Sequence, residues 1–224
     1  RRALIGAGWS IRARSMAALK VIGIAFFVVC FLSYFSLDCS LNKNREHGFY
    51  TLSSPNNDKF TGSFGFRCFT LGATEINDDG EEKFVGFIGC ISTYPLAEII
   101  LSLGAIIQWV LILTFVIMTI VGTRPKTVFI TMLALTGVAL LCTLICTIIA
   151  SSSINEKLIK KKIQELKIKV DVPDVQITTS KGFCLYTLII AVLLLIAQIA
   201  LAGGGFAISR NDAGYNAVGG TFSG

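Results

Sequence analysis

Four long stretches of the chain consist almost only of apolar residues, and each approaches or exceeds the length of a membrane-spanning helix. A helix rises 1.5 Å per residue, so crossing the ~30 Å hydrocarbon layer of a bilayer takes about 20 residues. Only a helix satisfies its backbone hydrogen bonds within one such segment. The first stretch is the shortest, and residues 16–20 extend it if Lys20 reaches toward the lipid phosphates. We predict transmembrane helices at residues 21–36, 96–121, 127–150 and 182–207.

The composition agrees with a lipid environment. Of the 224 residues, 53% are apolar and only 15% are charged. A soluble domain normally has about a quarter of its residues charged. We therefore predict an all-α membrane protein whose core is a bundle of four transmembrane helices.

Basic residues beside the apolar stretches predict the orientation. The segments 1–20 and 122–126 are short and have bases but no acids, which is typical of the cytoplasmic side. Segment 151–181 holds seven lysines against four acids and favours the cytoplasm as well. Each transmembrane helix takes the chain to the other side of the membrane, so segment 151–181 cannot lie on the same side as 1–20 and 122–126. We base the orientation on these two acid-free segments. The expected layout at the plasma membrane has 1–20, 122–126 and a mobile tail 208–224 in the cytoplasm, and the loops 37–95 and 151–181 outside.

The first outer loop contains the signals of a β-ribbon. Residues 63–67 and 83–88 are strand-like, and the Asn-Asp-Asp-Gly sequence of residues 77–80 is typical of a turn. Cys68 and Cys90 each follow one of the two stretches. A disulfide between these cysteines would link the ribbon in the oxidising space outside the cell.

The second outer loop contains one helical and one strand-like segment. Residues 154–168 place apolar side chains at helical spacing and predict an amphipathic extension of the third helix. Residues 167–179 alternate and contain Pro173, as an edge strand does. Because a lone strand is only marginally stable in water, we expect it to pair with the first loop. The two outer loops would then form a small extracellular β-sheet.

The chain has seven cysteines, of which three lie in the first outer loop. The third of these is Cys39, so one thiol of the loop stays free, is lipidated or bonds elsewhere. Cys39 can also compete for either partner of the Cys68–Cys90 pair, and a reduced pair is a further alternative. The other four are predicted to be small buried apolar residues within or near the spans: Cys30, Cys142, Cys146 and Cys184.

Polar residues within the predicted spans are few. Glu98 lies about one turn into the second span; an acid in lipid is costly and marks a functional candidate, although at this depth it can reach water or an outer-loop lysine. Gln108 and Trp109 lie near the middle of the same span, and we predict that Gln108 hydrogen-bonds across helices. Residues 203–205 are three glycines, which favour close helix packing or a flexible exit from the membrane.

No pattern typical of catalysis or of a metal site is present in the sequence. The single histidine, His47, stands in a loop without neighbouring ligands. Paired-cysteine zinc spacing, a nucleophile elbow and the broken-helix pairs of carriers are missing as well. We expect neither an enzyme nor an active transporter, and no cofactor, metal or nucleic-acid partner.

Two charged clusters stand in the outer loops. Clusters of opposite sign can select ions or partners through their field, while a solvated loop tip is the simpler interpretation. The acidic cluster is Asp78, Asp79, Glu81 and Glu82, and the basic cluster is Lys160, Lys161 and Lys162.

This layout resembles the claudin superfamily, which includes the peripheral myelin and epithelial membrane proteins and the stargazin-like receptor subunits. The resemblance covers nearly the whole chain: a long first outer loop with a cysteine pair, a tiny inner turn, a shorter second outer loop and cytoplasmic ends. The sequence Gly65-Phe66-Arg67-Cys68 is similar to the Gly-Leu-Trp stretch that precedes the first loop cysteine in claudins. Phe129, Gly137 and the opening of the fourth span, residues 182–186, are also similar to the family.

The chain departs from the claudin pattern at three points. The tryptophan before Cys68 is missing, Cys68 and Cys90 are more than twice as far apart as the claudin pair, and Glu98 stands where claudins have an arginine. The chain is therefore identified as a divergent member. Other four-span groups, among them the MARVEL-domain proteins, share the topology and remain alternatives.

The resemblance implies a protein of cell–cell junctions or adhesion, whose outer loops contact other membrane proteins in the same and the opposing membrane. The alternative is an auxiliary subunit that packs laterally against an ion channel or receptor. Small residues in the spans favour such lateral packing. A small channel built by oligomerisation is a third hypothesis, and the spans have few of the polar residues that a pore needs. The small residues are Gly104, Ala105, Gly137 and Ala139.

Overall fold

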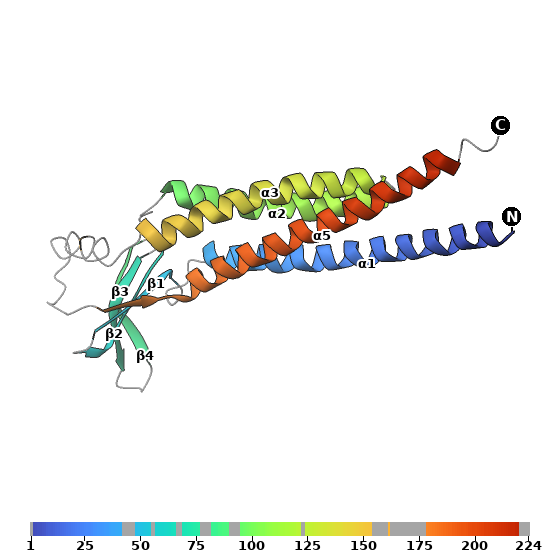
Figure 1. Cartoon of the computed structure of the whole chain (residues 1–224). Coiled ribbons are helices and arrows are strands. Elements are labelled where there is room, and N and C mark those ends of the chain that lie inside the picture. The colour runs from blue at the N-terminus through green and yellow to red at the C-terminus, as the bar shows by residue number, and fades with distance from the viewer. Residues whose placement is uncertain are drawn as a thin grey trace. The chain divides into compact units, whose positions relative to one another are not determined.

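Four long helices dominate the computed structural model: α1 (Arg2–Leu41), α2 (Pro95–Ile120), α3 (Pro125–Ile148) and α5 (Phe183–Gly219) (Figure 1). Each contains a segment that is long and apolar enough to cross a membrane by length and composition, so four apolar helices at the predicted positions are confirmed. These segments are Met16–Leu41, Pro95–Ile120, Pro125–Ser152 and Phe183–Arg210. The structure describes residues 2–41, 48–54, 57–65, 69–76, 82–89, 95–121, 124–153, 161 and 178–219.

Proline residues begin α2 and α3, and serine residues follow the end of α3. Pro95 and Pro125 are the first residues of α2 and α3, a position where the missing N–H costs nothing and the fixed φ suits the helix. A short π-helical turn, η1 (Ile149–Ser153), follows α3. The Ser151 hydroxyl donates a hydrogen bond to the Ile148 carbonyl oxygen at 3.2 Å, at the point where α3 ends.

The first and last helices are longer than predicted. α1 extends from the predicted 21–36 to Arg2 and Leu41. The tail predicted to be mobile from residue 208 is helical as far as Gly219. Hydropathy marks only the apolar part of a helix, whereas the helix ends where its backbone hydrogen bonds end.

A five-stranded antiparallel sheet unites segments of the two predicted outer loops. The first loop contributes four strands and the second contributes β5, in the order β4-β3-β2-β1-β5. The prediction of a sheet built by both loops is therefore confirmed. β5 is an outer strand of the described sheet, but it overlaps the predicted strand 167–179 only at residues 178 and 179. The strands are β1 (Tyr50–Ser54), β2 (Asn57–Phe64), β3 (Phe69–Ile76), β4 (Glu82–Gly89) and β5 (Thr178–Lys181) (Figure 1).

The strand pairing differs from the predicted ribbon. β4 pairs with β3, and not with residues 63–67, of which 63–64 end β2. β3 was not expected because its glycine, alanine and glutamate weaken a strand pattern. Pro173 and the predicted amphipathic segment 154–168, apart from Lys161, lie outside the described residues.

The chain divides into two compact units. Unit 1 comprises residues 1–34, 105–140 and 192–224, and unit 2 comprises residues 35–104 and 141–191. Unit 1 has an apolar core to which all four helices contribute, and unit 2 contains the sheet. The buried core of unit 1 consists of Phe26, Cys30, Leu111, Val128, Phe129, Met132 and Ala202.

One of the three adjacent glycines of α5 makes a close helix contact. A Cβ built on Gly205 would lie 2.5 Å from Cε1 and 2.6 Å from Cζ of Phe129 on α3. The same test on Gly203 and Gly204 finds no atom within 4 Å. Since α5 continues through all three glycines, close packing at Gly205, rather than a flexible exit, explains the motif.

Replacing Gly205 with alanine is therefore expected to destabilise the protein by about 1–3 kcal/mol, because the buried Phe129 ring has to move. Gly204→Ala is the matched control, and there the better helix propensity of alanine should raise stability by about 0.5–1 kcal/mol. Thermal unfolding of the detergent-purified protein measures both. Phe129→Leu should reduce the effect of Gly205→Ala, and equal behaviour of the two alanine variants would contradict the packing contact.

Candidate functional site

A network of buried polar side chains joins all four helices within unit 1. Gln108 on α2 and Gln198 on α5 are both fully buried. Both lie near the middle of their candidate spans. Around the two amides stand fully buried Ser33 of α1 and Thr136 of α3, with Cys30 of α1 only 1% exposed. The predicted hydrogen bonding of Gln108 across helices is thus confirmed.

The two glutamine amides are the centre of this network. Gln198 Nε2 donates to Ser33 Oγ at 2.6 Å and to Gln108 Oε1 at 3.2 Å. Gln198 Oε1 accepts a hydrogen bond from Thr136 Oγ1 at 3.4 Å. Gln108 Oε1 also accepts from Ser33 Oγ at 2.9 Å and from the Cys30 thiol at 3.2 Å. Gln198 therefore contacts polar groups on each of the other three helices.

The Gln108 amide nitrogen is buried without a hydrogen-bond partner. An unpaired buried donor costs free energy, on the order of 1–3 kcal/mol. By contrast, the Gln108 carbonyl oxygen has three donors around it. The network thus has spare donor capacity and contains no ionisable acid or base other than a thiol, which suits a structural contact between helices better than proton transfer.

The neighbouring Trp109 faces away from this network. Its ring is 49% exposed and makes an edge-to-face contact with Tyr34 of α1, with 5.3 Å between ring centroids. Aromatic pairs of this geometry add about 0.5–1.5 kcal/mol beyond the burial of their area. The two consecutive residues predicted at mid-span therefore have different roles: Gln108 connects helices inside, and Trp109 lies on the outer face.

In unit 2, three backbone segments meet where the sheet joins the last helix. Phe49 N–H donates to the Phe64 carbonyl at 2.8 Å, and Gly182 N–H donates to the Phe49 carbonyl at 2.8 Å. Cys184 N–H, in the first turn of α5, donates to the Gly48 carbonyl at 3.2 Å. These contacts connect β2, the segment before β1 and the start of α5.

Hydroxyl pairs join the two loops on the exposed side of the sheet. Thr51 of β1 and Ser180 of β5 share a short hydrogen bond, and Ser53 and Thr178 share one of 2.9 Å. Cross-strand pairs of this kind stabilise a sheet by about 0.2–1 kcal/mol each. Leu52 between them is buried. β5 is thus attached to β1 by side chains as well as by its backbone.

The predicted disulfide lies outside the described residues. Cys68 and Cys90 belong to the undescribed part of the chain, while their neighbours Phe69 and Gly89 are paired across β3 and β4. The linkage therefore stays a prediction. Cys39 is free, and its carbonyl oxygen accepts a hydrogen bond from the Cys184 thiol at 3.6 Å.

The predicted charged site residues are only partly described. Glu98 lies in the first turn of α2, where the positive end of the helix favours an acid. Glu82 is the first residue of β4, and Lys161 is exposed. The members outside the described residues are Asp78, Asp79, Glu81, Lys160 and Lys162.

Sequence reasoning missed three members of the network: Gln198, Ser33 and Thr136. Gln198 could have been found, because it is a lone amide within an otherwise apolar run. Ser33 and Thr136 carry no comparable signal, since single hydroxyl residues are common in spans and can bond to their own helix. No grouping of three or more histidine, cysteine or acidic side chains that could hold a metal occurs among the described residues.

The comparisons with known proteins give no family for this chain. No protein-family model matches it, and no curated protein sequence matches it.

Proposed function

We propose that this chain is a claudin-like membrane protein that crosses the plasma membrane four times and acts at cell–cell contacts, in adhesion or as part of a paracellular barrier. Its outer sheet would contact neighbouring molecules, and the helices would hold this sheet at the membrane surface. The observation that carries the proposal is the single sheet that two loops, separated by two candidate spans, build together.

The distribution of side chains supports a position in lipid. Two amides and two hydroxyls within the helices are fully buried: Ser33, Gln108, Thr136 and Gln198. Large apolar side chains point outward instead, as α2 illustrates. A water-soluble protein rarely exposes such continuous apolar surface, so lipid is the solvent that fits it. The α2 residues that are at least 47% exposed include Leu103, Ile106, Trp109, Leu113, Ile117 and Ile120.

The charges of the two units support the proposed orientation. The residues of unit 1 include eight lysines and arginines and one acid, whereas those of unit 2 include twelve and thirteen. Unit 1 comprises both chain ends and the turn 122–126. Because basic segments are retained in the cytoplasm, these parts belong inside the cell and the sheet belongs outside.

The architecture of the sheet supports a role in contacts. β4 and β5 are the two outer strands among the described residues, and the outer edge of a sheet is where a partner strand can add. Ser53, Thr178 and Ser180 are exposed, which gives a polar surface for partners.

Expression of the fluorescently labelled protein in non-adherent cells tests the proposal. The protein should accumulate where two expressing cells touch, and not where an expressing cell touches a non-expressing one. Surface labelling should reach the segments 37–95 and 151–181 from outside the cell. An even distribution around every cell, with normal surface levels, would argue against the contact role.

The acidic cluster predicts an ion preference of the contact. Replacing Asp78, Asp79, Glu81 and Glu82 by their amides should lower the permeability of a cell layer to Na⁺ relative to Cl⁻, because the negative field that attracts cations is removed. Replacing Lys160, Lys161 and Lys162 by glutamine should change the ratio in the opposite direction. Dilution potentials across monolayers measure both, and unchanged potentials would identify the clusters as solvated loop tips.

The auxiliary-subunit function has less support. Gly104, Ala105 and Ala139, which were expected to suit lateral packing, are buried within the chain itself. Only Gly137 keeps an open side, because a Cβ built on it meets no atom within 4 Å. Gly137 is thus the one observation that favours a lateral partner.

Replacing Gly137 with leucine separates this alternative from the first proposal. The thermal stability of the purified protein should remain within about 0.5 kcal/mol of the wild type, since the site is open. If a channel or receptor packs there, co-purification with it should be lost, and enrichment at cell contacts should persist if the protein is adhesive. Unchanged co-purification with such a partner would exclude Gly137 as the contact.

A further inference from the structure

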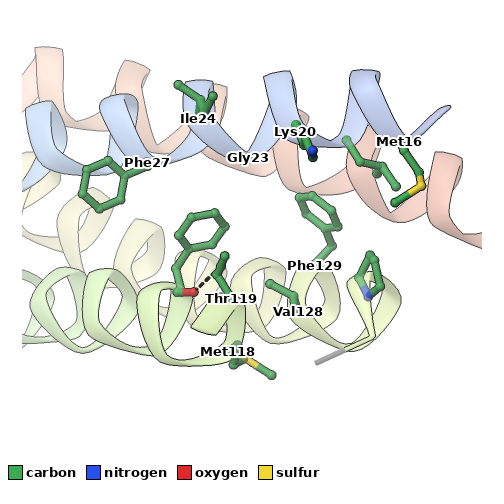
Figure 2. Close-up of a pocket in the computed structure, with 12 residues that line it drawn as sticks. Met16, Lys20, Gly23, Ile24, Phe27, Met118, Thr119, Val128 and Phe129 are labelled. Carbon is green, nitrogen blue, oxygen red and sulfur yellow. Dashed lines mark hydrogen bonds between the residues drawn. The ribbon is translucent and has the colours of Figure 1, made fainter. Parts of the chain in front are cut away.

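An apolar groove opens between α1, α2 and α3 within unit 1. It has a volume of about 510 Å³, which is within the range of ligand pockets. Along α1 it extends from Met16 to Phe27, a rise of roughly 16 Å at 1.5 Å per residue. Figure 2 shows Phe27 of α1 and Phe129 of α3 on opposite walls of this space.

Gly23 and Thr119 shape the groove and keep its wall apolar. Gly23 has no side chain, so the Phe115 ring lies close to α1: a Cβ built on Gly23 would be 3.4 Å from Phe115 Cζ. Thr119, the polar residue of the α2 wall, donates its hydroxyl hydrogen to the Phe115 carbonyl at 2.7 Å (Figure 2). The wall therefore offers hydrocarbon surface to whatever occupies it.

Lys20 adds a positive charge to this otherwise apolar wall. It lies on α1 one turn after Met16, its side chain is exposed, and it lines the groove (Figure 2). Arg124 and Lys126, which flank the groove residue Pro125, are exposed as well. Unit 1 has a single acid, Asp212, so the charge of this region is overwhelmingly positive.

We propose that the groove binds an acyl chain of an anionic phospholipid whose phosphate headgroup is held by Lys20. The inference rests on the proposed crossing of the membrane, with unit 1 on the cytoplasmic side. A long hydrocarbon chain matches the narrow apolar walls, and a negative headgroup matches the basic end. Basic pockets between helices on the cytoplasmic side are known binding places for anionic lipid headgroups.

Photo-crosslinking in nanodiscs tests the proposal on the full-length protein. One set of nanodiscs contains phosphatidylserine with a diazirine on its acyl chain, and the other set contains phosphatidylcholine with the same labelled chain. Mass spectrometry then locates the adducts. Phosphatidylserine should concentrate on residues 16–27 and 115–129, whereas phosphatidylcholine should label the exposed faces of all four helices evenly.

Two variants test the charge of Lys20 and the apolar space beside Gly23 separately. Lys20→Gln should lower the phosphatidylserine labelling of the groove about fivefold, the effect of one basic residue near an anionic surface, and leave phosphatidylcholine unchanged. Gly23→Leu fills the groove and should lower labelling by both lipids there. Lys181→Gln, which changes an exposed lysine of β5, is the control and should change neither.

Each outcome supports or overturns the proposal. Even labelling of all spans by both lipids, insensitive to Lys20→Gln, would overturn the lipid site but leave the crossing of the membrane intact. Labelling by neither lipid on any span would overturn the crossing itself. Adducts on a co-purified protein at the groove would identify a protein helix as the occupant and overturn the lipid site.

Discussion

Replacing Gly182 with alanine is expected to abolish the junction between the sheet and α5. A Cβ at this position would overlap the carbonyl oxygen of Gly48 and lie 3.1 Å from the Phe49 carbonyl carbon. These are backbone atoms, which cannot move aside as the end of a flexible side chain does. We expect a loss of about 3 kcal/mol or more in the free energy of unfolding, measured by thermal or denaturant unfolding in detergent.

The same variant should lose its enrichment at cell contacts, because the sheet no longer keeps its attachment to α5. Gly48→Ala should behave similarly, since its Cβ would lie 2.7 Å from the Phe64 backbone nitrogen. Gly204→Ala, on an open part of α5, is the control that should retain both stability and enrichment. Surface biotinylation separates lost contact from lost transport to the membrane. Wild-type stability of Gly182→Ala would disprove the close approach.

Replacing Gln198 with leucine is expected to destabilise the four helices by about 1–2 kcal/mol. The change removes the donor to Ser33 Oγ and the acceptor of the Thr136 hydroxyl, both of which are buried where water cannot replace them. Hydrogen bonds between membrane helices contribute about 0.6 kcal/mol on average and up to about 1.7 kcal/mol, so loss of several together gives this size. Thermal unfolding in detergent measures the change.

Gln108→Leu should be much milder than Gln198→Leu. This substitution removes the unpaired amide nitrogen of Gln108. The groups that donate to the Gln108 oxygen also have other acceptors: the Ser33 hydroxyl can donate to the Cys30 carbonyl at 2.9 Å, and the Gln198 amide donates to Ser33 Oγ. The double variant should be less destabilised than the sum of the two single variants, because the amides interact directly. Equal losses for the two single variants, or strict additivity, would contradict the hydrogen bonding described for the network.

The helices were predictable because their signal is local. A run of about 20 apolar residues meets a physical requirement, the thickness of hydrocarbon, that does not depend on the rest of the fold. The second and third helices begin within two residues of their predicted starts, at Pro95 and Pro125. The continuation of α1 to Arg2 and of α5 to Gly219 was missed because polar residues and glycines at helix ends obey backbone hydrogen bonding and not hydropathy.

The sheet and the network were only partly predictable. That the second outer loop pairs with the first followed from the marginal stability of a lone strand, yet the pairing of β3 with β4 depends on contacts that no local pattern specifies. Gln108 was identified as a polar residue in an apolar run. Its connection to Gln198, 90 positions further along the chain, depends on how the helices rotate about their axes.

The sequence by itself determined that this protein has four apolar helices, two connecting segments with strand-forming stretches, and a strong excess of bases in the N-terminal segment and the short turn. These properties follow from composition within single segments. Only the tertiary structure decided which amides meet, that Gly205 rather than Gly203 or Gly204 accommodates Phe129, and that a groove remains beside Gly23. Such contacts join atoms from distant segments, and their energies exist only after the helices have packed.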